Sequence, residues 1–299
     1  MAKKKNSEIN EYHLNRNQPD RPQLAVIDLK SHLKTNQCRV SQPHMHSFYQ
    51  IIWFKKGKGT HFIDFKTYDV FDNAIFFVAK NQVHYFDNNT NYEGVLIHFN
   101  ELFLLQDQSP NEFFLNCNLF NNPYQQPSCC VGTGIDGILN EYIAQIKDEL
   151  NNDEMFGKEM LLRNLLKSFL IQIQRRKCEF EKSFNQLPQL MNEKRLQLIK
   201  FITLINENYN KGLTISEYAR QLNMSSRSLS ELTHQLLNKT PSQMIQERII
   251  LEAQRLLLYS ELNINQVGYR LGFDDASYFV KYFKKYTNLS PSEFRKSVS

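Results

Sequence analysis

The chain has 299 residues, of which 41% are hydrophobic, and a formal net charge of +5 at pH 7. This length suffices for two domains of ordinary size, and the hydrophobic content supports folded cores. The sequence has no run of 18 apolar residues and no apolar stretch behind its basic N-terminus, so we expect neither a membrane-spanning helix nor a secretory signal.

The positive charge lies in the C-terminal third of the chain. Residues 195–299 contain 14 Lys and Arg against 9 Asp and Glu, whereas the first 194 residues contain 22 of each kind. We therefore expect any contact with a polyanion to involve the C-terminal segment, although a charge of +5 is also ordinary for a soluble domain.

The cysteines indicate a reducing compartment. Their number is odd and no C-x-x-C spacing occurs, so unpaired thiols and a cytoplasmic location are expected. The five positions are Cys38, Cys117, Cys129, Cys130 and Cys178.

The N-terminal part of the chain is predicted to be a polar arm followed by β-strands. Residues 1–22 are polar, with three consecutive lysines near one end, and are interpreted as a mobile arm. From Leu24 to about Asn100, short runs rich in β-branched and aromatic residues alternate with turn residues, which predicts a small antiparallel barrel or jelly roll. The predicted strands are Leu24–Leu29, Tyr49–Phe54, Thr60–Phe65, Ile75–Val78 and Gly94–Phe99.

Three histidines mark a candidate effector site in this barrel. His44 and His46 precede a predicted strand and His84 follows about forty residues later, which resembles the two motif regions of cupin barrels. Gln50 stands where an enzymatic cupin usually offers Glu, so we predict no metal site and no cofactor. The three histidines, with Trp53 in the pocket wall, are interpreted as polar groups of an effector pocket; a structural role is the main alternative and metal binding a lesser one.

Two amphipathic helices are predicted after residues 101–135, a segment of little periodicity in which only a short helix at Glu101–Leu105 is expected. They span Ile138–Leu150 and Met160–Gln174. The second helix has an apolar face wider than one contact with a barrel needs, so we expect a partner subunit to cover it; the alternative is a helix sandwiched within its own domain. The predicted dimerisation residues are Leu162, Leu166, Phe169 and Ile173.

An internal repeat organises the C-terminal segment. Residues Ile215–Met224 match Ile264–Phe273 at a spacing of 49, and after one inserted residue Thr240-Pro241 matches Ser290-Pro291 at a spacing of 50. Each copy has the form of a helix-turn-helix. Four helix starts fit the capping-box pattern, in which a side-chain oxygen and a residue three positions later satisfy the first N–H groups. They are Thr214 with Glu217, Thr240 with Gln243, Asn263 with Gln266, and Ser290 with Glu293.

This segment resembles the signature of AraC/XylS-type transcription regulators over about 105 residues, from Arg195 to Ser299. The resemblance implies two helix-turn-helix units joined by a long helix at about Ser242–Leu258, each with a recognition helix in the DNA major groove. It also suits the preceding barrel, which looks like the sensor domain common in this family. The matching residues are Arg255-Leu256, Ile264, Val267-Gly268, Leu271-Gly272-Phe273, Tyr278-Phe279, Phe283-Lys284-Lys285 and Leu289-Ser290-Pro291.

Helical periodicity predicts which residues of the first recognition helix, about Ser226–Leu237, face DNA. Arg227 can donate two hydrogen bonds to guanine. Glu231 departs from the family, which often places a basic residue there, and is either a base reader or a neutral rim residue. The residues predicted to face outward and contact DNA are Ser226, Arg227, Ser230 and Glu231, with His234 also outward.

The second recognition helix, about Asp275–Tyr286, is predicted to turn Phe279, Phe283 and Tyr286 inward. Its outward charges suit phosphate contact better than detailed base recognition. The predicted DNA-contacting residues are Ala276, Ser277, Lys281 and Lys284, with Val280 also outward.

Together these features predict an α+β fold of two domains, an N-terminal cupin-like β-barrel with a helical dimerisation segment and a C-terminal all-α double helix-turn-helix. The predicted boundaries are 1–22 for the arm, 23–177 for the sensor domain, 178–193 for a polar linker and 194–299 for the DNA-binding domain, with helix-turn-helix units at about 214–237 and 263–286.

The predicted function is regulation of transcription through a specific site on double-stranded DNA, controlled by a small-molecule effector in the barrel. A homodimer is expected, with RNA polymerase as a further partner if the protein is an activator. We expect neither enzymatic activity nor binding to a membrane. One alternative is a DNA-binding regulator whose barrel is only a dimerisation scaffold; a metal-dependent cupin enzyme is a remote second alternative.

Overall fold

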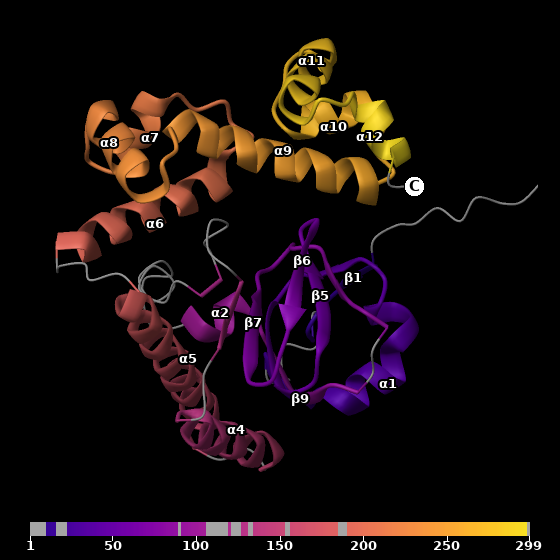
Figure 1. Cartoon of the computed structure of the whole chain (residues 1–299), viewed down its shortest axis with the longest axis vertical. Helices are drawn as coiled ribbons and strands as arrows, with labels where there is room; N and C mark the ends of the chain where they lie inside the picture. The colour runs from indigo at the N-terminus through magenta and orange to yellow at the C-terminus, as the bar shows by residue number, and fades with distance from the viewer. Residues whose placement is uncertain are drawn as a thin grey trace, which may run out of the picture. The chain divides into compact units, whose positions relative to one another are not determined.

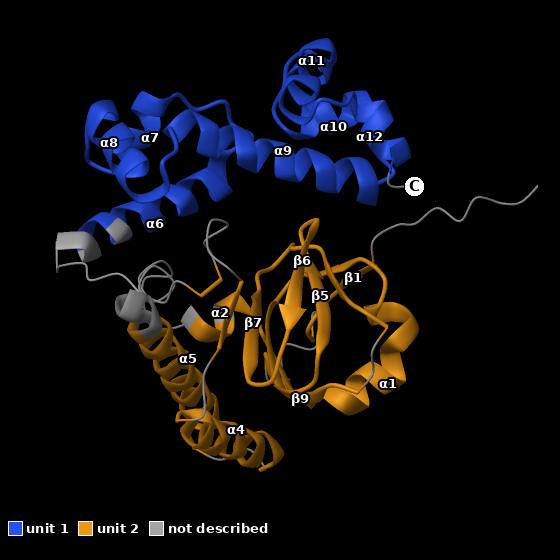
Figure 2. Cartoon of the chain, in the orientation of Figure 1, with its two compact units in different colours: residues 1–9, 188–299 blue, residues 10–187 orange. Residues whose placement is uncertain are grey.

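The structure is a computed structural model that describes residues 10–15, 23–88, 91–105, 119–120, 127–130, 134–152, 156–184 and 190–297. These residues fall into two compact units, shown in different colours in Figure 2. The N-terminal unit lies within Asn10–Leu187, and the C-terminal unit includes Pro188–Ser299. The predicted two-part α+β organisation is confirmed, with the strands in the first unit and a helical second unit (Figure 1).

Two five-stranded sheets make up the β-structure of the N-terminal unit. Within the described residues they remain separate sheets rather than one closed barrel, and all pairings are antiparallel except that between the first and third strands. The first sheet has the order β1 (Asn10–Tyr12), β3 (His44–His46), β8 (His84–Phe86), β5 (Gly59–Ile63), β6 (Lys66–Val70). The second has the order β10 (Ser128–Cys130), β7 (Ala74–Val78), β4 (Tyr49–Lys56), β9 (Glu93–Phe99), β2 (Leu24–Asp28).

Alternation along β4 divides the N-terminal unit into two cores. Ile52 and Phe54 pack between the two sheets, together with Phe86 from the first sheet. Ile51 and Trp53 pack on the opposite face of the second sheet. Because both faces are covered, the strand is buried continuously from Tyr49 to Phe54, a pattern typical of strands covered on both faces rather than of strands with one face in water.

Helices cover the outer face of the second sheet. They are α2 (Glu101–Leu105), α4 (Asp136–Asn151) and α5 (Lys158–Phe184). The four residues predicted to form a dimerisation face are fully buried in this core, with exposed fractions of 0%. That prediction was wrong. Helical periodicity shows only that an apolar face must be buried, and here the outer face of the chain's own second sheet buries it. The four residues are Leu162, Leu166, Phe169 and Ile173.

Several elements differ from the sequence predictions. Residues 10–12, within the predicted mobile arm, form β1, which pairs with β3 in parallel. Helix α1 (Leu29–Val40) was not predicted; Asp28 caps its N-terminus by accepting a hydrogen bond from the backbone nitrogen of Ser31 at 2.8 Å. The predicted linker at 178–193 begins inside α5 and ends inside the next helix, and residues 185–189 lie outside the described part of the chain.

The C-terminal unit contains the predicted pair of helix-turn-helix units. All four predicted capping boxes are present as reciprocal hydrogen bonds. The long helix α9 packs against α6 and α8 of the first half and against α10, α11 and α12 of the second half. The helices are α6 (Leu190–Asn208), α7 (Ile215–Gln221), α8 (Ser226–Leu237), α9 (Pro241–Tyr259), α10 (Ile264–Arg270), α11 (Ala276–Thr287) and α12 (Pro291–Ser297).

The two helix-turn-helix turns use different residues for the same backbone conformation. Asn223 has a φ of 55° and Gly272, at the matching repeat position, has a φ of 85°. Glycine is required at the second turn, since a Cβ there would lie 1.9 Å from the carbonyl oxygen of Asn210. Within the described residues, no helix has the length and apolar character to cross a membrane.

We expect Phe169→Ala to destabilise the N-terminal unit by about 3–5 kcal/mol, because it leaves a cavity in a closed core. Trp53 is the only tryptophan and lies in the same core, so its fluorescence during urea unfolding measures this effect. Ile171→Ala is the control, because Ile171 lies on the same helix with 39% of its surface exposed and should cost far less. If the wild type is a dimer and Phe169→Ala is a stable monomer, the original prediction that this face of α5 mediates dimerisation would be correct after all.

Candidate DNA interface and candidate effector site

The first recognition helix, α8, turns polar side chains away from a buried apolar stripe. Ser225 caps its N-terminus and Asn238, in the left-handed conformation, ends it. Leu229, Leu232 and Thr233 are buried in the unit. The predicted contact residues lie on the other side: Arg227, Ser230 and Glu231 are exposed and Ser226 is half-buried.

Arg227 and Glu231 form an ion pair one helical turn apart. The Nε atom of Arg227 lies 2.9 Å from a carboxylate oxygen of Glu231, and their side chains are 89% and 60% exposed. Such an exposed pair adds little stability, about 0.3–0.5 kcal/mol. It does restrict the orientation of the guanidinium, whose terminal nitrogens are the donors for guanine.

The second recognition helix, α11, presents lysines and serine on its outward side. Ser277, Lys281 and Lys284 are exposed, and Ala276 is half-buried. Phe279 and Phe283 are fully buried, as predicted.

Two side chains of α11 differ from the periodicity-based prediction. Tyr286 was predicted to face inward but is 38% exposed, because it lies in the last turn, where its ring packs against Tyr282 at 4.9 Å between centroids. Val280 was predicted to face outward but packs partly against the core of the second helix-turn-helix.

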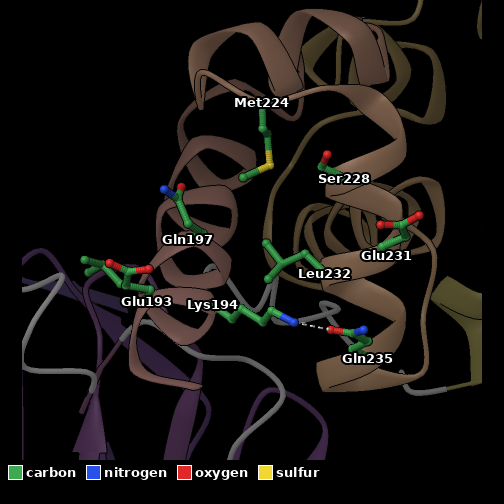
Figure 3. A pocket seen from close by; sticks show the side chains of 9 residues that line it. Glu193, Lys194, Gln197, Met224, Ser228, Glu231, Leu232 and Gln235 are labelled. Atoms are coloured by element: carbon green, nitrogen blue, oxygen red, sulfur yellow. Dashed lines mark hydrogen bonds between the residues drawn. The ribbon is translucent and has the colours of Figure 1, made fainter. Parts of the chain in front are cut away.

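A groove that the sequence did not predict lies between α6 and α8 (Figure 3). It has a volume of about 510 Å³, and Lys194 donates a hydrogen bond across it to Gln235 at 2.8 Å. Its walls come from segments some 30 residues apart in sequence, which no local pattern connects. The lining residues are Glu193, Lys194, Leu196, Gln197, Met224, Ser228, Glu231, Leu232 and Gln235.

In the N-terminal unit, the structure brings the three predicted histidines together. His44 and His46 in β3 lie beside His84 in β8, and the three are 2%, 5% and 0% exposed. Their ring centroids lie between 4.3 and 5.0 Å apart. The Nδ1 atom of His44 lies 2.8 Å from the carbonyl oxygen of Gln42, and Nε2 of His84 lies 3.1 Å from Nδ1 of His46.

Two further histidines, missed in the sequence, extend this group into an interior histidine cluster of His44, His46, His61, His84 and His98. The ring of His61 lies 5.3 Å from that of His84, and the ring of His98 lies 6.0 Å from that of His46. Strand alternation was the available signal for His98, since Ile97 and Phe99 on either side belong to the outer core. It required a register that only the pairing of β9 supplies.

The interior cluster has more polar atoms than hydrogen-bond partners. Among the described residues, no hydrogen-bond partner is present for five buried atoms: both ring nitrogens of His61, Nδ1 of His84, Nε2 of His98 and Oε1 of Gln50. A buried unsatisfied polar group costs about 1–3 kcal/mol, so native proteins contain few of them. Their concentration here marks a place where a ligand can supply the missing contacts.

The cluster is uncharged at neutral pH. Burial lowers the pKa of His44 to about 4 and those of His61 and His98 to about 3. Burial also lowers the pKa values of His46 and His84 well below the usual range. A histidine in the unfolded chain has a pKa of about 6.5. Below that pH the unfolded chain therefore binds protons that the folded cluster does not bind, and the free energy of unfolding falls as the pH drops.

Trp53 does not belong to this site. It is 1% exposed and packs in the outer core, on the face of β4 opposite to that of Ile52 and Phe54. The prediction that Trp53 lines the effector pocket was wrong, because adjacent strand residues point to opposite faces and the register was unknown.

Two family models match the chain. The AraC-like ligand binding domain matches residues 33–166, and the helix-turn-helix domain matches residues 218–297. Among known proteins, the HTH-type transcriptional activator RhaR of Enterobacter sp. (strain 638) is 23% identical over 254 residues, which are 84% of this chain and 86% of that protein. RhaR of Escherichia coli (strain K12) is 24% identical over 260 residues, with the same coverage.

Solved structures also resemble the chain. The C-terminal domain of the response regulator yesN from Fusobacterium nucleatum is 28% identical, with a TM-score of 0.31, and covers 35% of this chain and 98% of that one. ToxT from Vibrio cholerae is 15% identical, with a TM-score of 0.41, and covers 92% of this chain and 97% of that one. With one family model on each unit and relatives aligned over most of its length, the chain belongs to the AraC-type DNA-binding transcriptional regulators.

Proposed function

We propose that this regulator recognises its DNA site mainly through α8, attaches to the backbone mainly through α11, and changes its DNA affinity when a ligand occupies the interior of the N-terminal unit. The observation that carries the ligand part is the group of buried polar atoms in the interior histidine cluster that have no hydrogen-bond partner among the residues described. The DNA part rests on the exposed side chains of the two recognition helices.

The different roles that we assign to α8 and α11 follow from the charged side chains on their exposed faces. Arg227 on α8 has the donors for bidentate contact with guanine, and Glu231 holds it by an ion pair. On α11 the outward charges are Lys281, Lys284 and Lys285, point charges suited to phosphate. We therefore assign base discrimination to the first unit and anchoring to the second.

The remaining parts of the proposal concern partners. The RhaR relatives are activators, and we propose activation by contact with RNA polymerase, in the compartment that holds the DNA, the bacterial cytoplasm. We also propose a homodimer, whose interface must use surface other than the buried face of α5 around Leu166 and Phe169.

Arg227→Ala is expected to weaken binding to the cognate duplex by about 1–3 kcal/mol and to relax the preference at one base pair. Titrations against a duplex selected from a random pool, and against its scrambled version, measure this ratio. Lys211→Ala removes the same charge between α6 and α7 and serves as the control. If Arg227→Ala leaves the specificity ratio unchanged, α8 is not the helix that reads the bases.

Lys281→Ala and Lys284→Ala are each expected to weaken binding to every duplex by a similar factor. Each change should also reduce the slope of log affinity against log salt by about 0.9, the amount for one phosphate contact. Titrations at several salt concentrations give the slope, with Lys→Arg variants at both positions as charge-retaining controls. A loss confined to the cognate duplex would contradict the anchoring role.

Ligand and DNA binding are expected to affect each other equally. A thermal-stabilisation screen of small molecules supplies a ligand, whose affinity is measured with and without operator DNA, and operator affinity is measured with and without ligand. Linkage requires the same factor in both experiments, about 5–150-fold for couplings of 1–3 kcal/mol. Unchanged affinities in both pairs would leave the N-terminal unit as a scaffold.

A further inference from the structure

His44, His46 and His84 have the arrangement of a metal site. Each offers one imidazole nitrogen, and the three nitrogens lie within 4.8 Å of one another in the buried interior of the N-terminal unit. Two adjacent strands hold them, with His44 and His84 as direct partners across the β3–β8 ladder. The backbone pairing, rather than a flexible loop, therefore sets their separation.

The distances are close to those that a bound ion requires. Two imidazole nitrogens on one tetrahedral Zn²⁺, each at 2.0–2.1 Å, lie about 3.3 Å apart. Nδ1 of His46 and Nε2 of His84 already lie 3.1 Å apart. The widest separation, 4.8 Å, requires the third ring to approach by about 1.5 Å, a change within reach of side-chain rotation.

Hydrogen bonding prepares one of the three rings for this role. Nδ1 of His44 lies 2.8 Å from the carbonyl oxygen of Gln42, so it carries the hydrogen and donates it. The lone pair is then on Nε2. A metal-ligating histidine is commonly oriented in this way, with its second nitrogen donating to a backbone carbonyl.

The ring of His84 has a buried nitrogen that lacks a hydrogen-bond partner among the described residues. His84 is 0% exposed, and within the described part of the chain nothing accepts from or donates to its Nδ1 atom. The rings of the three histidines are 4.3 to 5.0 Å apart between centroids, which is close contact.

The donor set indicates the class of ion. Three imidazoles without a carboxylate favour Zn²⁺, Co²⁺, Ni²⁺ or Cu²⁺ over Mg²⁺ or Ca²⁺, which prefer oxygen ligands. Glutamine at position 50, in place of a carboxylate, does not prevent binding, since three histidines and a water can complete a zinc site.

We propose that His44, His46 and His84 bind one divalent transition-metal ion through their imidazole nitrogens, with a fourth position open to water or a further ligand. This inference deepens the proposed function, on which it rests for its regulatory meaning, because it names the class of ligand that enters the N-terminal unit. The metal site itself is testable without DNA.

The test measures Zn²⁺ binding to the purified full chain by equilibrium dialysis and calorimetry, and records the visible spectrum of the Co²⁺ form. One ion per chain is expected, with Co²⁺ bands of a nitrogen-ligated site and no competition from Mg²⁺. His46→Gln and His84→Gln should each weaken binding by more than about tenfold, since even changes beyond the ligands cost that much.

Two control variants separate the site from other effects. His234→Gln removes an exposed histidine of α8 and controls for binding at the surface. Trp53→Phe changes a side chain that is buried like the histidines but lies in the outer core, on the other face of the second sheet, and it controls for disturbance of the fold. Both should retain wild-type Zn²⁺ affinity. If the histidine variants do not fold, the Co²⁺ spectrum of the wild type still decides whether nitrogen ligands bind the ion.

Absence of stoichiometric Zn²⁺ binding, or equal binding by wild type and both folded histidine variants, would overturn the inference. Failure of the metal-site inference and failure of the proposed function give different experimental outcomes. If an organic ligand passes the reciprocity experiment but no metal binds, the proposed function stands and the metal site falls. If Zn²⁺ binds as expected but neither it nor any screened ligand changes operator affinity, the metal site stands and ligand control of DNA binding falls.

Discussion

Burial of one β-sheet on both faces is the constraint on which the N-terminal unit depends. Six of the eight residues of β4 and six of the seven residues of β9 are buried, and removing both faces of a sheet from water requires two covering layers. The first sheet supplies one layer, and α4 and α5 supply the other. The wide apolar face of α5 is therefore used within the chain, and the two cores separate Trp53 from the histidines.

The same arrangement creates an unusual interior between the sheets. Most of its walls are aliphatic or aromatic, yet five histidines and Gln50 are buried there, and several of their polar atoms have no partner in the part of the chain that the structure describes. Such groups lower stability unless something bonds to them. In a regulator this loss of stability is useful, because a ligand that forms hydrogen bonds with the polar atoms stabilises the conformation to which it binds.

The C-terminal unit uses one scaffold twice with different outward chemistry. Matching capping boxes begin α7 and α10, and matching turns at Asn223 and Gly272 follow them. The outer side of α8 carries an arginine–glutamate pair, whereas that of α11 carries lysines beside a row of tyrosines. Because the inward residues preserve the fold, the outward residues are available to differ, and the two halves are suited to different contacts with DNA.

The sequence alone determined the features that depend on neighbouring residues. Capping boxes and helix periodicity act over a few residues, so the boundaries of α8 and of five strands were predicted closely, and the repeat indicated the two helix-turn-helix units. The extent of α9 came from the family resemblance. The residue types of the histidine site were also visible, in His44, His46 and His84.

Only the tertiary structure decided which surfaces meet. Strand register places Trp53 on the outer face and adds His61 and His98 to the interior, because a shift of one residue exchanges the two faces. The cover over Phe169 and its neighbours comes from strands that lie far away in sequence. Periodicity states that a face must be buried, but the partner that buries it is selected by long-range packing, which no local pattern encodes.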